Sequence, residues 1–301
     1  MSRYFEQLRQ QLLAPAMRLS AEQLLDIWQH DDVIVETPLP PDFEDCPDLN
    51  LRLRGAWLRQ LHARRLERPR LDDPFERPAG WQLLYEWEPP TIGALRLARP
   101  FVVHSRIRGT RLQVCVRLFG RARWHAPEVQ QALLAAMEGG VRLKARGIHV
   151  ALAVQHSWIA RTDGLAYPPH VPTTGMLRME SPLQVRRGKE KVIDPVAILL
   201  AAARRVAAVA PWMDAELLVD WAQLRACCEG LLIRMAQAHD VHFLAHSIRQ
   251  RDVPVPVRAL GGALHMSGAM EPMLPFLRLA EFTGVGSSAA KGLGQVCFVA
   301  V

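Results

Sequence analysis

The segment Leu277–Val296 reads LRLAEFTGVGSSAAKGLGQV, and it places four glycines and one lysine within Gly284–Gly294. Apolar residues precede this loop at helical spacing, and a short hydrophobic run follows it to Val301. Glycine allows positive φ and close approach to a ligand, and successive free N–H groups can surround an anion. Lys291 adds positive charge to the loop. The segment therefore predicts a helix, a phosphate-binding glycine-rich loop and a final strand.

The spacing of these glycines excludes two common nucleotide-binding motifs. A P-loop needs Gly, four residues and then Gly-Lys-Ser/Thr, but Ala289 and Ala290 stand where Gly and Lys would follow Gly284. The first six residues fit the looser dinucleotide fingerprint, which requires a helix and a second parallel strand afterwards, and only seven residues follow Gly294. A nucleotide cofactor is therefore not expected. A glycine-rich turn into an edge strand, without any ligand, is the alternative interpretation.

Composition points to an anionic partner. The chain has 301 residues, half of them apolar, which is enough for one large domain or two of about 150 residues each. Its formal net charge is +7, and only four of its 37 basic residues are lysines. Arginine binds phosphate bidentately and stacks on bases, so an arginine-rich basic protein is compatible with nucleic acid. A GC-rich genome would also produce many arginines.

The cysteines and the N-terminus indicate the compartment. No two of the five cysteines have zinc-knuckle spacing, and the number of cysteines is odd. The N-terminus does not resemble a signal peptide. The longest apolar run, Val196–Ala210, is interrupted by Arg204 and Arg205, so we do not expect it to span a membrane. The sequence predicts a reduced, soluble, cytoplasmic protein.

The two halves of the chain end alike, each with an apolar helix, a glycine-containing basic loop and a hydrophobic strand. A duplicated βαββαβ unit would produce this repeat, so we predict an α+β fold of tandem ferredoxin-like, RRM-like units. The N-terminal unit, with helical and proline-rich insertions, would span 1–160 and the C-terminal unit 172–301, with a linker at 161–174. The expected helices are 20–30, 51–66, 129–137, 194–209, 214–238 and 274–279, and the expected strands are 101–106, 110–119, 148–154, 177–185, 242–249, 255–265 and 296–301.

Four segments upstream of the glycine-rich loop contribute to a family resemblance. They are VRLFG at 116–120, MESPLQV at 179–185, SIRQ at 247–250 and GGALHMSG at 261–268. With the Gly-x-Gly and Gly-hydrophobic-Gly ending, the chain resembles the RAMP superfamily, and within it the CRISPR-associated endoribonucleases that process precursor crRNA. The resemblance covers most of residues 50–301, and the C-terminal motif is its specific part.

The resemblance implies an activity. Members of the family bind a CRISPR repeat RNA, usually a small hairpin, and cut it once at its 3′ base without a metal or other cofactor. The 2′-hydroxyl attacks the adjacent phosphate and leaves a 2′,3′-cyclic phosphate and a 5′-hydroxyl. This chemistry requires a base, an acid and cations around the phosphorane. The expected partners are repeat RNA, mature crRNA, which the enzyme would keep bound, and other CRISPR effector subunits.

The resemblance places the catalytic base on or after the first helix of the N-terminal unit, where His62 is the best match. Arg59 and Arg65 lie three residues to either side, so all three share one helix face. Neighbouring arginines disfavour a cationic histidine, which suits a neutral base. A solvated basic helix face is the alternative, His30 is the second candidate for the base, and some branches of the family use arginine instead. No tyrosine is expected near His62.

Other candidate residues concern RNA and metal. His239, His242 and His246 have the spacing of metal ligands on a helix, but the surrounding sequence favours a strand with surface or interface histidines. The predicted RNA-binding residues are Gly284, Gly286, Ser287, Ser288, Lys291, Gly292, Gly294 and Arg249.

Three functions compete at this point. The first is a metal-independent endoribonuclease that cleaves CRISPR repeat RNA and stays bound to its product. The second is a non-catalytic crRNA-binding RAMP subunit of an effector complex. The third is an unrelated metabolic enzyme that binds a phosphorylated small molecule, which would require clustered carboxylates that the chain lacks. His62 and its arginines favour the enzyme over the scaffold.

Overall fold

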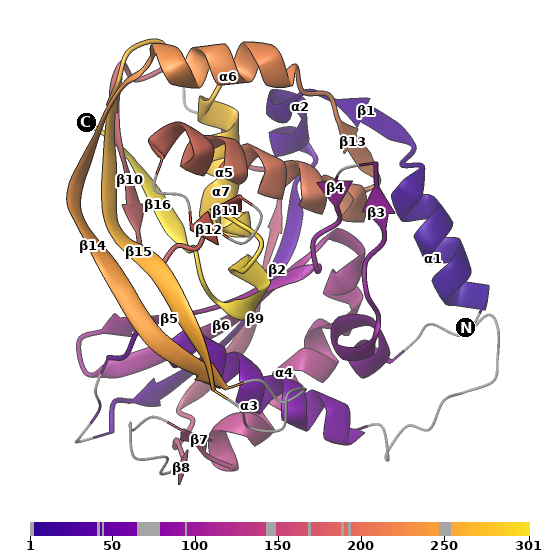
Figure 1. Ribbon diagram of the computed structural model, residues 1–301. Helices are drawn as coiled ribbons and strands as arrows, with labels where there is room; N and C mark the ends of the chain where they lie inside the picture. The colour runs from indigo at the N-terminus through magenta and orange to yellow at the C-terminus, as the bar shows by residue number, and fades with distance from the viewer. Residues whose placement is uncertain are drawn as a thin grey trace.

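Two four-stranded antiparallel sheets form the framework of the computed structural model (Figure 1). The structure describes residues 3–40, 43, 45–64, 79–93, 95–142, 149–167, 170–187, 190–191, 194–246 and 254–301. In each sheet the first and third strands of a βαββαβ unit are central, which is the ferredoxin-like order. The predicted α+β fold of tandem ferredoxin-like units is confirmed.

The N-terminal unit has the strand order β5-β6-β2-β9. Helices α3 and α4 cover one face of this sheet, where Trp57 packs edge-on against Phe101 with ring centres 5.1 Å apart. The elements of this unit are β2 (Gln29–Pro38), α3 (Leu49–Ala63), β5 (Phe101–Arg108), β6 (Arg111–Phe119), α4 (Ala126–Glu138) and β9 (His156–Asp163).

The C-terminal unit repeats this order as β14-β15-β10-β16. Helices α5 and α7 lie together on one side of the sheet, and the long β14–β15 hairpin reaches toward α3 (Figure 1). The elements are β10 (Thr174–Met179), α5 (Pro195–Val209), β14 (Leu232–His246), β15 (Pro254–Ser267), α7 (Leu274–Thr283) and β16 (Val296–Ala300).

Additional elements surround the two units. Strand β1 pairs in parallel with β13, so the N-terminal segment adds to the second half of the chain. A π-helical turn, Gln82–Glu86, and short 3-10 helices at Gly120–His125, Ala210–Met213 and Ala289–Lys291 connect longer elements. The rest are α1 (Arg3–Leu13), β1 (Met17–Leu19), α2 (Ala21–Asp26), β3 (Thr91–Ile92), β4 (Leu95–Arg96), β7 (Val141–Arg142), β8 (His149–Val150), β11 (Arg186–Arg187), β12 (Glu190–Lys191), β13 (Ala215–Leu217) and α6 (Trp221–Gly230).

The helix predicted at 214–238 is wrong. The Asp220 carboxylate accepts hydrogen bonds from the N–H groups of Ala222 and Gln223 and begins a new helix, α6, which ends at Gly230. Strand β14 starts two residues later. The apolar spacing continues across Asp220 and Gly230, which predicts one long helix, but the helix begins after the first of these residues and ends at the second.

Two strand predictions are also wrong in position. In the segment 148–154, of which residues 149–154 are described, the strand is His149–Val150, and β9 is the edge strand that completes the N-terminal sheet. The strand predicted at 177–185 ends at Met179, after which the Ser181 hydroxyl accepts a hydrogen bond from the N–H of Gln295. The expected helix at 20–30 is α2, and β2 begins at residue 29.

Helix α5 and its 3-10 extension form Pro195–Met213, which is long and apolar enough to cross a membrane, with a mean hydropathy of 1.5. The sequence-based expectation that Arg204 and Arg205 exclude a membrane span by composition is therefore wrong. Burial argues against a membrane span, because 78% of the most apolar 18-residue stretch of this segment is buried inside the protein. This segment has the burial of a core helix.

Arg117 on β6 joins the two units where the N-terminal sheet meets the end of α7. Its guanidinium donates to both carboxylate oxygens of Asp32, at 2.6 and 2.7 Å, and to the carbonyl oxygens of Glu281 and Phe282. The guanidinium also lies 4.8 Å from the centre of the Phe282 ring. Cations stabilise helix C-termini, so Arg117 neutralises the half-buried Asp32 and caps α7 at the same time.

Candidate nucleic-acid interface

The glycine-rich loop adopts the backbone predicted for it. Gly284, Gly286, Gly292 and Gly294 have φ of 71°, 82°, 86° and 73°, the left-handed region that favours glycine. The reason for glycine differs from the prediction, however. A Cβ at Gly292 would lie 2.4 Å from the Cβ of Asn50, so the protein's own atoms occupy the space that this glycine leaves free.

Side chains from both units hold this loop. The Asn50 side-chain amide at the start of α3 donates to the Gly292 carbonyl at 3.0 Å, and the Ser105 hydroxyl donates to Asn50 at 2.7 Å. The hydroxyl of Ser288, which is buried, donates to the side-chain oxygen of Gln184 at 3.0 Å. The loop is therefore fixed at the junction of the units, and its role in RNA binding stays a prediction.

Ser287 and Lys291 are the exposed residues of this loop, and both line a cavity of about 770 Å³. Helix α5 forms one wall, and α3, α6 and the segment after β4 contribute to the others. The charged side chains that line the cavity are mostly cationic, and a concentration of positive charge in a concave surface attracts anions. The only carboxylate among the described lining residues is Asp194. The cationic lining residues are Arg54, Arg96, Arg99, Arg204, Arg205, Arg225 and Lys291. We call this the basic cavity.

Arg205 is the most buried cation of the basic cavity, with 6% of its surface exposed. Its Nε donates to the carbonyl oxygen of Thr283 at 3.2 Å, whereas its Nη2 has no hydrogen-bond partner among the described residues. Burial lowers the pKa of Arg205 to about 10, so the guanidinium stays charged at neutral pH. A buried charge is costly unless an opposite charge is near.

His62 lies in the last turn of α3, beside the π-helical turn. Its ring centre is 4.6 Å from that of Tyr85 and 6.3 Å from that of Trp81. The expectation that no tyrosine lies near His62 is therefore wrong, because the fold brings a residue 23 positions away against it. Arg99, which lines the basic cavity, donates to the carbonyl oxygen of Leu84 at 2.9 Å. The π-helical turn therefore contacts both His62 and a residue that lines the cavity.

The distance along α3 separates the two predicted parts of the site. Asn50 contacts the glycine-rich loop, and His62 follows twelve residues later on the same helix, which corresponds to about 18 Å at 1.5 Å per residue. Arg59 is exposed on this helix, one turn before His62. Arg65 and Arg249 lie outside the described residues.

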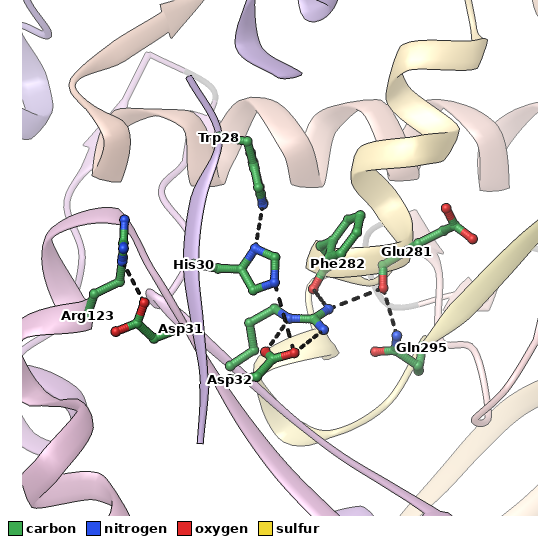
Figure 2. Close-up of polar contacts among 9 residues, drawn as sticks. Trp28, His30, Asp31, Asp32, Arg123, Glu281, Phe282 and Gln295 are labelled. Carbon is green, nitrogen blue, oxygen red and sulfur yellow. Dashed lines mark hydrogen bonds and ion pairs between the residues drawn. The ribbon is translucent and has the colours of Figure 1, made fainter. Parts of the chain in front are cut away.

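His30, the second candidate for the base, is buried with 2% exposure and is inaccessible to a substrate. Its Nδ1 accepts a hydrogen bond from the indole N–H of Trp28 at 3.0 Å, and its Nε2 lies 3.9 Å from the Asp32 carboxylate (Figure 2). Burial, reinforced by Arg117, lowers the pKa of His30 to about 3. His30 is therefore a neutral core residue between the units.

The histidines at 239, 242 and 246 lie on strand β14, as the sequence favoured. Residues at odd and even positions of a strand point to opposite faces, so the spacing of His239 and His242 does not gather them as it would on a helix. Within the described part of the chain, no three His, Cys, Asp or Glu side chains are grouped so that they could hold a metal ion.

Sequence reasoning missed most of the residues that line the basic cavity. They come from α3, α5, α6 and the segment after β4, and only the fold brings them together. One signal was present: Arg204 and Arg205 interrupt an otherwise apolar helical run. A charged pair in such a run indicates a polar site at the helix surface as readily as it indicates a soluble protein.

Comparisons of sequence and of fold relate this chain to known proteins. Residues 177–296 match the family described as CRISPR-associated endoribonuclease Cas6. No curated protein matches the chain. Among solved structures, Thermus thermophilus Cas6 (TTHB231) is similar with a TM-score of 0.55 and 14% identity, over 90% of this chain and 99% of that one.

Two product complexes show the same fold. The Cas6 (TTHB231) product complex has a TM-score of 0.53 and 15% identity over 90% of this chain and 100% of that one. The Cas6 (TTHA0078) product complex has a TM-score of 0.51 and 19% identity over 89% and 99%. The predicted resemblance is therefore confirmed: in its C-terminal sequence and in its fold, the chain is similar to the CRISPR-associated endoribonucleases of the RAMP superfamily.

Proposed function

We propose that this protein is an endoribonuclease that cleaves CRISPR repeat RNA and stays bound to the mature crRNA. The observation that carries the proposal is the basic cavity at the glycine-rich loop. The loop itself lies within the residues that match the Cas6 family. Arginines bind phosphate through paired hydrogen bonds. The cavity and loop would therefore hold the RNA backbone at the junction of the two units.

The proposed chemistry needs no metal. His62 takes the proton from the 2′-hydroxyl, whose oxygen forms a bond to the adjacent phosphorus while the bond to the 5′-oxygen breaks. The leaving oxygen gains a proton, and the products carry a 2′,3′-cyclic phosphate and a 5′-hydroxyl. Arg59 and Arg65 would stabilise the charge that develops on the phosphorane. The aromatic rings of Tyr85 and Trp81 beside His62 support a fixed orientation of the imidazole.

The partners follow from the same proposal. Two proteins of this fold are described as product complexes, which supports crRNA as the ligand here, and other CRISPR effector subunits would bind the complex. The five free cysteines are compatible with the reducing cytoplasm, where we place the protein.

The direct test is cleavage of a labelled cognate repeat RNA in EDTA. We expect a single cut that persists in EDTA and is abolished by a 2′-deoxy substitution at the nucleotide 5′ of the cut. The products should carry a cyclic phosphate and a 5′-hydroxyl. A cut that EDTA abolishes, or that the deoxy RNA still undergoes, would contradict the mechanism.

One observation favours a second function, a non-catalytic crRNA-binding subunit. Asn50, which holds the glycine-rich loop, lies about 18 Å along α3 from His62, so the loop could hold RNA without bringing a scissile phosphate to the histidine. Tight binding of the repeat RNA without a cut would support this scaffold role. Absence of both binding and cleavage would contradict both functions.

A further inference from the structure

An exposed aromatic ring lies against one of the arginines that line the basic cavity. Trp221 is the first residue of α6 and is 39% exposed. The Arg204 guanidinium carbon lies 5.9 Å from the centre of its ring. Arg225 follows one turn later on the same face of α6, lines the cavity and pairs with Glu229 at the surface, 3.5 Å away. An exposed indole between arginines offers a surface for a nucleobase.

Helix α5 also contributes a buried positive charge to the cavity. Arg205 follows Arg204 on α5, lines the cavity, and has an Nη2 group without a hydrogen-bond partner among the described residues. The Thr283 carbonyl satisfies only its Nε. An anion in the cavity would supply the missing partner, and a phosphate oxygen matches a guanidinium in charge and geometry.

We propose that the α5–α6 end of the basic cavity binds a short single-stranded segment of RNA, with one phosphate on Arg205 and a neighbouring base stacked on Trp221. The inference rests on the proposed function in taking RNA as the ligand. A volume of about 770 Å³ lies within the range of small-ligand sites, so it accommodates a few nucleotides and not a hairpin stem. Stacking on an aromatic ring and arginine contacts to phosphate are how proteins bind single strands with little sequence preference.

The test is the affinity of a fluorescein-labelled single-stranded RNA octamer, measured by anisotropy at several salt concentrations. Removing one base–aromatic stack costs about 1–3 kcal/mol, so Trp221→Ala should weaken binding roughly tenfold. Trp221→Phe keeps an aromatic ring and should restore most of the affinity. Leu218→Ala, which truncates another exposed apolar side chain near α6, should bind like wild type.

Arg205→Gln tests the phosphate contact through a quantity that a purely structural role would not change. Losing one phosphate contact should reduce the slope of log affinity against log salt by about 1, at a temperature where thermal unfolding shows the variant folded. An unchanged slope would overturn the assignment of phosphate to Arg205. If this variant does not fold, the Trp221 series decides the proposal.

Failure of this inference can be told apart from failure of the proposed function. A repeat hairpin trimmed of its single-stranded flanks tests cleavage without the octamer site. Cleavage of that hairpin, with equal octamer binding by Trp221→Ala and Leu218→Ala, would overturn the inference and leave the function standing. No cleavage, with octamer binding that depends on Trp221, would overturn the function and support the site. An octamer that wild type does not bind would overturn the inference outright.

Discussion

His62 is the side chain on which the proposed chemistry depends. General acid–base groups contribute about 10²–10⁴-fold to rate, so His62→Ala should slow single-turnover cleavage of repeat RNA by that factor while leaving RNA affinity nearly unchanged. His156→Ala, at an exposed position at the start of β9, is the matched control and should cut at the wild-type rate. Equal rates for the two variants would assign the base to another group, and the burial of His30 would leave arginine as the candidate.

At the scale of elements, sequence patterns predicted the helices and strands whose periodicity is regular. Helix α5 begins at its predicted proline, and β5 and β6 lie where alternating apolar residues indicated. Strand β2 was missed because its sequence, QHDDVIVETP, contains two acidic residues that are typical of loops. Asp31 is buried and Asp32 is half-buried because they pair with Arg123 and Arg117. These partners are close in space but lie on elements that are distant in the sequence.

The candidate site could likewise be predicted from the sequence only in part. The glycine-rich loop could be recognised from its own residues because positive φ is a local property. The basic cavity could not, since it forms where four separate elements meet, and Tyr85 reaches His62 only through the π-helical turn. Local patterns predict backbone conformation, whereas the side chains of this site are brought together by tertiary packing.

The fit of the glycine-rich loop against α3 gives a prediction for this element. In Gly292→Ala the new Cβ would meet Asn50 at 2.4 Å, and the residue would keep a φ near 86°. The left-handed conformation alone costs about 1–2 kcal/mol, so the free energy of unfolding should fall by at least that amount, and RNA affinity should fall as the loop moves. Gly230→Ala, with no atom within 4 Å of its Cβ, is the control and should leave both quantities unchanged in urea unfolding and RNA-binding measurements. Equal stability of the two variants would contradict the close fit.

At the scale of the whole molecule, the two units meet over a buried polar cluster. Arg117 and Asp32 form its ion pair, and His30 and His104 lie beside them with 2% and 7% exposure. Burial, reinforced by Arg117, lowers the pKa of each histidine to about 3. The pKa of Asp32 is lowered to about 2, because the effect of Arg117 outweighs the opposing effect of burial. The junction is therefore neutral overall when the histidines carry no proton.

This arrangement predicts that acid weakens the junction before it protonates Asp32. An unfolded chain protonates its histidines below about pH 6.5, whereas His30 and His104 stay neutral in the folded protein down to about pH 3. The unfolded state therefore binds more protons across this range, and each histidine should lower the free energy of unfolding by up to about 1.4 kcal/mol per pH unit as the pH falls. Asp32 acts later, since its contribution is present above about pH 3.8 and is lost only as the pH falls through about 2. Urea unfolding of wild type and His104→Leu between pH 7 and pH 5 would measure this: the variant should show the shallower dependence on pH, and equal slopes would mean that His104 is protonated in the folded protein despite its burial between the units.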